Sequence, residues 1–296
     1  MKIGINQFCF PSGTEVEEAL GRAKKMGYDT FEVCLTAGNR ITGFSSGVTD
    51  ALDISGYYNP FCNTESTEQD FMILKKKAQD TGIRIGSVGG IVSFSIYPLS
   101  AVEEKTAVKS MDAVKKMVDA ARIVGADTVL VIPGMLTEDM EYRETYERVQ
   151  QRVAALAEYA GDINIAIENV WNNFLYSPLE LCRFVDEIGR NNVGVYFDIA
   201  NARRFGYPEQ WIRTLSFRIK GIHVKDYRVA VDNIHGFTNI LDGDVNYRKV
   251  MEALGMIGYD GQFTVELIPP AHHLVDQTLA YARRVCTDLI NLRMEV

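Results

Sequence analysis

The sequence predicts a closed (β/α)8 barrel, a ring of eight parallel strands surrounded by helices. Strand-like and helix-like segments alternate along the chain, and this alternation is typical of a parallel sheet. Eight such units within 296 residues match one barrel domain, residues 1–296, better than an open sheet. The first strand is followed by CFPSGTE, which lacks the glycine-rich GxGxxG turn common in open dinucleotide-binding sheets.

The predicted strands are short, mostly apolar runs. They occupy 2–8, 29–35, 83–94, 127–133, 163–168, 193–198, 219–223 and 261–267. Between the second and third strands, residues 36–63 are rich in Gly, Ser, Thr, Asn and Tyr and show no clear period. We predict a long loop there over one end of the fold, and leave open whether it is a lid or a subunit contact.

The helices follow the strands in order, and two of them carry clear start signals. They are predicted at 15–27, 68–81, 100–125, 141–160, from 178 onward, 208–215, 246–258 and 274–292. Ser100 and Glu103 have capping-box spacing. Ser177, Pro178 and Glu180 combine an N-cap serine, a proline at the first helical position and a glutamate at the third.

Composition favours a cytoplasmic enzyme that acts on a small molecule. The net charge is −8 and the two signs are interspersed, which gives no support to nucleic-acid binding or to an anionic membrane surface. The five cysteines are widely spaced without a CxxC pair, as expected of reduced thiols. The start MKIGINQFCF is too polar and too short for a signal peptide, and no 18-residue apolar run exists. Homo-oligomer formation is left open.

The last four predicted strands each end in a side chain of a type that binds metals. These residues are Glu168, Asp198, His223 and Glu266. Because side chains alternate across a strand, the bulky apolar residues of each run face one layer and the polar residue at its end faces the other. In a barrel of this class the carboxyl ends of the strands carry the active site. Four adjacent strands therefore aim three carboxylates and an imidazole at one space.

Each of these residues alone has a simpler interpretation, as a helix N-cap, a solvated loop carboxylate or a hydrogen-bonded structural histidine. Their concurrence at one end and with one parity favours a shared role. Three converging carboxylates would repel one another, and a divalent cation relieves that repulsion. The mainly hard ligand set suits one Mn²⁺, Mg²⁺ or Co²⁺ ion, and Zn²⁺ also fits.

Several segments resemble the xylose-isomerase-like TIM barrel superfamily, in particular its sugar-phosphate isomerase/epimerase branch, which includes ketose 3-epimerases and L-xylulose or L-ribulose 5-phosphate epimerases. These segments are IENVWNNFLYSPLE, YFDIANARRFGYPEQWI, GIHVKDY, LDGDVNY and GYDGQFTVEL. The resemblance implies that the four strand-end residues bind one divalent metal. It also implies that Glu168 and Glu266 stand on opposite faces of a sugar or sugar phosphate as proton-transfer groups.

Five further residues are candidates for substrate binding, each with a competing structural role. They are Glu32, Trp171, Asn201, Lys225 and Arg228. Lys225 would contact substrate or pair with a neighbouring carboxylate, and Arg228 resembles a family position near the substrate but is equally a loop arginine. Asn201 stands where many free-ketose epimerases carry His, which favours the sugar-phosphate relatives. Trp171 would wall the pocket or cap a loop, and Glu32 would reach substrate or be a core residue satisfied by its neighbours.

Rival functions stay beside the epimerase. An inosose-type dehydratase would use the same metal and base, and a non-catalytic sugar-binding protein would keep the pocket without needing both glutamates. An apurinic endonuclease of the same superfamily needs a histidine-rich multi-zinc site. That function is disfavoured, because only His223 of the four His lies at a strand end and the net charge is negative. Xylose isomerase itself is disfavoured because its metal-site lysine would fall at Val170. The sequence does not choose between a free sugar and a phosphorylated one.

Overall fold

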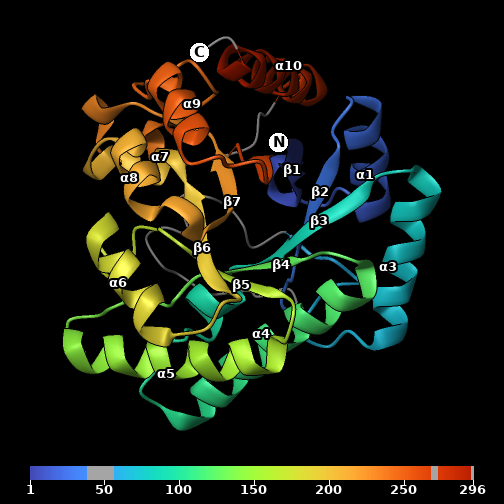
Figure 1. Cartoon of the computed structure of the whole chain (residues 1–296). Coiled ribbons are helices and arrows are strands. Elements are labelled where there is room, and N and C mark those ends of the chain that lie inside the picture. The colour runs from blue at the N-terminus through green and yellow to red at the C-terminus, as the bar shows by residue number, and fades with distance from the viewer. Residues whose placement is uncertain (39–56, 268–272, 295–296) are drawn as a thin grey trace.

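A computed structural model describes residues 1–38, 57–267 and 273–294. Eight parallel strands form a closed barrel in the order β1-β10-β7-β6-β5-β4-β3-β2, and β1 pairs with both β2 and β10 to close it. Figure 1 looks into this ring, with the helices arranged around its outside. The prediction of a closed (β/α)8 barrel is confirmed.

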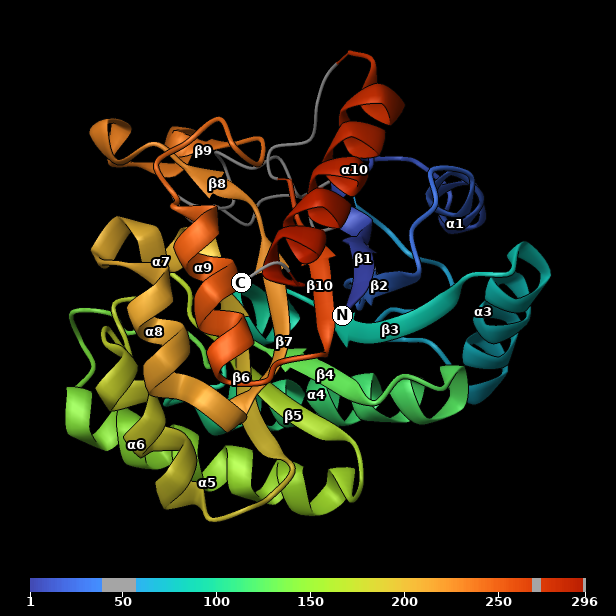
Figure 2. The same ribbon diagram turned by 45° about the horizontal axis from the view of Figure 1, so that its top comes forward.

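The barrel strands lie close to their predicted positions. They are β1 Lys2–Asn6, β2 Thr30–Cys34, β3 Arg84–Gly89, β4 Thr128–Val131, β5 Asn164–Glu168, β6 Val193–Asp198, β7 Ile219–Val224 and β10 Gln262–Val265. A short antiparallel pair, β8 Asp226–Tyr227 and β9 Phe237–Thr238, was not predicted. Figure 2 shows this pair beyond the end of β7. It therefore adds to the end of the barrel at which the predicted site lies.

The helices pack around the barrel in chain order. They are α1 Val16–Lys25, α3 Glu68–Thr81, α4 Glu104–Val124, α5 Tyr142–Ala160, α6 Pro178–Ile188, α7 Ile199–Phe205, α8 Pro208–Leu215, α9 Tyr247–Met256 and α10 Val275–Met294. Both α3 and α8 have their predicted bounds, whereas the short α7 was not predicted. Within the described part of the chain, none of these helices has the length and apolar character needed to cross a membrane.

One helix start is confirmed and another is wrong. Ser177 caps α6 by accepting a hydrogen bond from the backbone N–H of Glu180 at 3.2 Å, as predicted. The capping box expected at Ser100 and Glu103 does not form, because α4 begins later, at Glu104. The Ser100 hydroxyl instead donates to the Met135 carbonyl at 2.6 Å. Ser100 thus ties the loop before α4 to the loop after β4.

The third strand is shorter than predicted. It ends at Gly89, and Val92–Ile96 form a π-helical turn, η3, in place of the expected strand extension. A side chain at Gly90 would come within 2.7 Å of the Leu35 carbonyl oxygen, so glycine suits the point at which the chain leaves the sheet. The apolar residues Val92 and Phe94 are thus buried in a turn rather than in a paired strand.

Two apolar layers separate the inside of the barrel from its outside. The large outer layer lies between strands and helices and includes Ile165 and Ile167, whereas Ala166 belongs to the small inner cluster. The inner cluster consists of Phe94, Leu130, Ile132, Ala166 and Tyr196. Because Glu168 shares the parity of Ala166, its side chain points into the barrel mouth.

The predicted loop 36–63 is only partly described. Residues 39–56 lie outside the described residues, and so do the proposed lid and subunit-contact roles of that segment. At its described ends, Thr36 forms a parallel bridge with Asn63. The hydroxyl of Tyr57 donates to the carbonyls of Phe8 and Phe10, which anchors this end of the segment to the loop after β1.

Candidate metal centre

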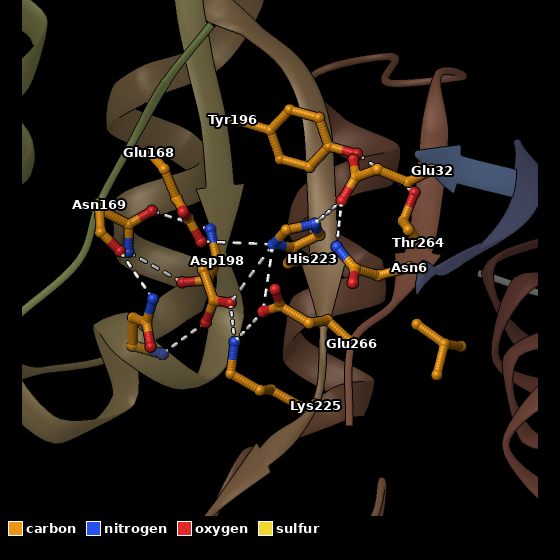
Figure 3. Close-up of polar contacts among 12 residues, drawn as sticks. Asn6, Glu32, Glu168, Asn169, Tyr196, Asp198, His223, Lys225, Thr264 and Glu266 are labelled. Carbon is orange, nitrogen blue, oxygen red and sulfur yellow. Dashed lines mark hydrogen bonds and ion pairs between the residues drawn. The ribbon is translucent and has the colours of Figure 1, made fainter. Parts of the chain in front are cut away.

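The structure brings the four strand-end residues together. Glu168 and Asp198 end β5 and β6, His223 lies on β7, and Glu266 follows β10. All four are buried, and one potential ligand atom from each lies within 4.8 Å of the others. Figure 3 shows them converging from neighbouring strands. They thus form one compact, water-poor cluster.

The imidazole of His223 turns a different nitrogen to each side of the cluster. Its Nδ1 lies 3.3 Å from Glu168 Oε1, 3.3 Å from Glu266 Oε2 and 3.9 Å from Asp198 Oδ2. Its Nε2 lies 2.7 Å from Glu32 Oε1. A carboxylate behind Nε2 holds the proton on that nitrogen, which leaves Nδ1 to serve as a metal ligand.

Glu32 lies behind His223 and is fully engaged there. Its carboxylate accepts hydrogen bonds from Asn6 Nδ2 at 2.5 Å and from the Ser87 hydroxyl at 2.6 Å, in addition to the contact with the imidazole. Its exposed fraction is 1%. Of the two interpretations drawn from the sequence, that of a core residue satisfied by its neighbours describes its position. The sequence did not indicate that its partner is His223.

Lys225 sits among the carboxylates. Its ammonium donates to Glu266 Oε2 at 2.5 Å and to Asp198 Oδ2, and the residue is buried. Burial alone would lower the pKa of Lys225, but Asp198 and Glu266 outweigh it and raise the pKa. Pairing with neighbouring carboxylates, one of its two predicted roles, is the one seen.

A pair of asparagines holds Asp198 from the other side. Asn169 accepts from the backbone N–H of Asp198 at 2.8 Å and donates its side-chain amide to the Asp198 carbonyl at 2.9 Å. The backbone N–H of Asn201 donates to Asp198 Oδ1 at 2.6 Å, and its side chain donates to the Asn169 carbonyl at 2.9 Å. Asp198 therefore caps α7 with one oxygen and presents the other to the cluster. The sequence prediction missed Asn169, although its place directly after Glu168 was a usable signal.

The surroundings shift the pKa values of Glu168 and Glu266 in opposite directions. Burial raises the pKa of Glu168 to about 7, and the charges of Glu266 and Asp198 act in the same direction against His223. Burial alone would also raise the pKa of Glu266, but the positive charges of His223 and Lys225 outweigh it and lower the pKa. In the metal-free cluster one glutamate can thus carry a proton near neutral pH while the other stays ionised.

His223 is held in its charged form when the cluster contains no metal ion. Burial alone would lower the pKa of His223, but Glu266 and Glu32 outweigh it and raise the pKa well above its usual value. The imidazolium and the Lys225 ammonium together offset the carboxylates around them. In the metal-free cluster, these two protonated side chains therefore supply the positive charge.

The four residues fit a single divalent metal ion. Ligands at about 2.1 Å from one ion lie at most about 4.2 Å apart, so the cluster needs only small shifts to surround one. Three carboxylates and one imidazole are donors that Mn²⁺, Mg²⁺, Co²⁺ and Zn²⁺ all accept. The ammonium already lying against two of the oxygens shows that this space accepts positive charge.

The mouth beside the cluster is small and has one apolar wall. A cavity of about 60 Å³ is bounded by Glu168, His223 and Glu266 on its polar side. Its lining also includes Phe8, Cys34, Ile91, Leu130 and Ile132. These apolar residues all come from the first half of the barrel, which also contributes Asn6 and Glu32 to the lining.

Trp171 and Arg228 lie farther out. The indole Nε1 of Trp171 donates to the Asn201 carbonyl at 3.1 Å, and its ring stacks on Phe237 with centroids 4.9 Å apart. Together with Asn169 and Asn201 it lines a cavity of about 290 Å³. Arg228 is exposed and donates to the carbonyl of Asp242 at 3.0 Å, so the structure places it outside the cluster.

Comparison with known proteins gives two curated relatives. The chain is 27% identical over 184 residues to Uncharacterized protein MJ1311 of Methanocaldococcus jannaschii, a match that spans 58% of this chain and 61% of that protein. It is 22% identical over 272 residues to the Haemophilus influenzae protein named Putative L-ribulose-5-phosphate 3-epimerase SgbU, covering 90% of this chain and 88% of that one.

Solved structures share the fold over nearly the whole chain. A D-tagatose 3-epimerase-like protein superposes with a TM-score of 0.77 at 19% identity, covering 100% of this chain and 99% of that one. The IOLI protein, solved with a bound zinc atom, has a TM-score of 0.74 at 16% identity, covering 98% of each chain. The family model described as Xylose isomerase-like TIM barrel matches residues 20–285, in agreement with the resemblance seen in the sequence. This chain therefore belongs to the xylose isomerase-like TIM barrel family.

Proposed function

We propose that the protein is a divalent-metal-dependent epimerase or isomerase of a ketose or a ketose phosphate. The observation that carries this proposal is the pair Glu168 and Glu266, which come from β5 and β10 and meet at one cluster with Asp198 and His223. Their pKa values are shifted in opposite directions. Relatives named as epimerases of ketoses and of L-ribulose 5-phosphate support the substrate class.

The reaction needs a base beside a weakly acidic C–H bond. A divalent ion bound by the four residues would stabilise the negative charge that develops on the substrate oxygens when the proton leaves. In the metal-loaded protein one of the two glutamates would accept the proton from the carbon, and the other would deliver a proton from the opposite face. Proton transfer from opposite faces inverts the carbon, whereas a single base would return the proton to the same face or move it to the next carbon. Two glutamates therefore favour epimerisation.

The surrounding residues would hold the side chains of the proposed metal ligands in position. Glu32 fixes the His223 ring, and the Asn169–Asn201 pair fixes Asp198, so that the ligands do not need to be ordered at each turnover. Burial of all four ligand residues limits the entry of water that would otherwise screen their charges. In this proposal Lys225 and Trp171 contact the sugar, while Arg228 reaches it only after a movement.

Exchange of substrate hydrogen with solvent tests the proposal. The metal-loaded protein is incubated in D₂O with a panel of ketoses and ketose phosphates, and NMR follows each carbon. We expect deuterium at one carbon next to the carbonyl, together with the epimer at that carbon. A dehydrated product would identify a lyase instead, and tight binding of a sugar without exchange would identify a binding protein. Either result would overturn the proposed reaction.

A further inference from the structure

Lys225 occupies oxygens that a metal ion would need. Its ammonium contacts Asp198 Oδ2 and Glu266 Oε2, and these are the same two oxygens that face His223 Nδ1. Figure 3 shows the ammonium between the two carboxylates, on the side of them away from Glu32. Lys225 comes directly after the end of β7 at Val224, and its ammonium contacts the same two carboxylates that face the imidazole of His223.

The Lys225 ammonium and a metal ion cannot both contact these two oxygens without a large electrostatic cost. A divalent ion bound at about 2.1 Å from both oxygens would stand within a few ångströms of Nζ in its present position. Two positive charges at that separation repel strongly in a buried site, where water screens them poorly. The same oxygen lone pairs that accept hydrogen bonds from Nζ would also have to coordinate the metal. The two cations therefore compete.

We propose that Lys225 is a built-in counter-cation, which neutralises Asp198 and Glu266 while the centre is empty and is displaced from them when the metal binds. This inference rests on the metal site of the proposed function. It assigns to Lys225 a role in metal loading, separate from any contact with substrate. The role is one of positioning, since Lys225 acts through the two ligands it contacts.

The displaced side chain has a second favourable contact within reach. The centroid of the Phe237 ring lies 5.1 Å from Nζ, and the face of an aromatic ring attracts an ammonium group. Phe237 in turn stacks on Trp171, so the ring is held in place. The side chain can thus leave the carboxylates without losing every partner for its charge.

Competition with the metal and a purely structural role for Lys225 predict opposite effects on metal affinity. If Lys225 competes with the metal, Lys225→Met keeps the length of the side chain, removes its charge and binds the metal more tightly. If Lys225 only braces the ligands in position, the same change loosens them and weakens metal binding. Without metal, the Met variant is expected to be less stable than the wild type, because its carboxylates lose their counter-charge.

Metal titration of stripped proteins decides between these roles. Mn²⁺ binding is measured by calorimetry for the wild type, Lys225→Met and Lys225→Arg. Lys220→Met, near the start of β7 and so at the far end of that strand from Lys225, is the matched control. We expect at least tenfold tighter binding for Lys225→Met, and values within about threefold of the wild type for the other two. Equal or weaker binding by Lys225→Met overturns the inference. Failure of the wild type to bind Mn²⁺ overturns the proposed function as well.

A measurement on the wild type covers the case in which Lys225→Met does not fold without metal. In metal-free protein labelled with ¹⁵N at the lysine side chains, a buried ammonium gives a signal protected from solvent exchange, assigned by its loss in Lys225→Arg. We expect diamagnetic Zn²⁺ to shift or remove this signal. A signal that stays unchanged at saturating Zn²⁺ overturns the inference while leaving the metal site intact.

Discussion

The two halves of the barrel contribute different things to one centre. The second half, from β5 to β10, provides every proposed metal ligand and also Lys225. The first half, from β1 to β4, provides Glu32 with its two donors on the far side of His223, and the apolar wall of the small cavity. The charges that would react thus lie in one half, and the groups that orient and shape the site lie in the other.

This division gives a way to separate chemistry from positioning. Changes in the second half should remove the reaction or the ion itself, whereas changes in the first half should loosen the site in steps. The expected effects therefore decrease from the ligands outward.

The largest effect is expected from the proton-transfer pair. Glu168→Gln and Glu266→Gln should each lower turnover by about 10²- to 10⁴-fold, because neither amide can exchange a proton with the substrate. Deuterium exchange measured by NMR reports the loss, and circular dichroism shows whether the barrel still folds. Glu158→Gln, a change at an exposed glutamate on α5, is the matched control and should keep wild-type turnover. Turnover above a tenth of the wild-type rate in either site variant would remove that glutamate from the mechanism.

The first half should act through His223. Glu32→Gln keeps the shape of the side chain but removes the charge behind Nε2, so metal affinity should fall about 10- to 100-fold. Calorimetric titration with Mn²⁺ measures the change, and thermal melting confirms the fold. An unchanged affinity would mean that the imidazole is oriented without Glu32.

Metal binding should also depend on pH. The pKa of Glu168 is raised to about 7 and that of His223 is raised above its usual value, so both groups hold protons that the metal must displace. Affinity should therefore rise from pH 6 to pH 8, by up to about tenfold per pH unit for each proton released. Titrations in two buffers of different ionisation enthalpy count these protons. A count of zero at pH 6.5 would contradict the raised pKa values.

The smallest effect is expected farther from the ion. Ser87→Ala removes one of the donors to Glu32 and should cost about 1 kcal/mol of unfolding free energy. Its effect on Mn²⁺ affinity should be weaker than that of Glu32→Gln.

Arg228→Ala changes a residue that contacts neither Glu32 nor the four proposed ligands, and it should change the unfolding free energy by less than about 0.5 kcal/mol. Denaturant unfolding and metal titration of the two variants together check this order.

The features of the fold and the site that could be predicted from the sequence are those marked by patterns among neighbouring residues. Alternation along β5 to β10 identified the inward residue at each strand end, and the Ser177–Pro178 start located α6, because such patterns depend on a few neighbouring residues. The barrel followed from the order of the elements. These features need no knowledge of distant contacts.

The parts that could not be predicted depend on residues far apart or on side chains with two roles. Glu32 and His223 are separated by 191 positions, and no local pattern links them. Asp198 ends β6 and also caps α7, so the helix begins without the break that usually marks a helix start. The π-helical turn after Gly89 has the sequence pattern of a strand because its apolar residues Val92, Phe94 and Ile96 alternate with serines.

Anomalous diffraction from crystals grown with Mn²⁺ tests the central claim most directly. We expect one strong peak per chain, bound by Glu168, Asp198, Glu266 and Nδ1 of His223, with Glu32 remaining on Nε2. A peak bound by other residues, or crystals saturated with Mn²⁺ that show no peak among these four side chains, would contradict the account.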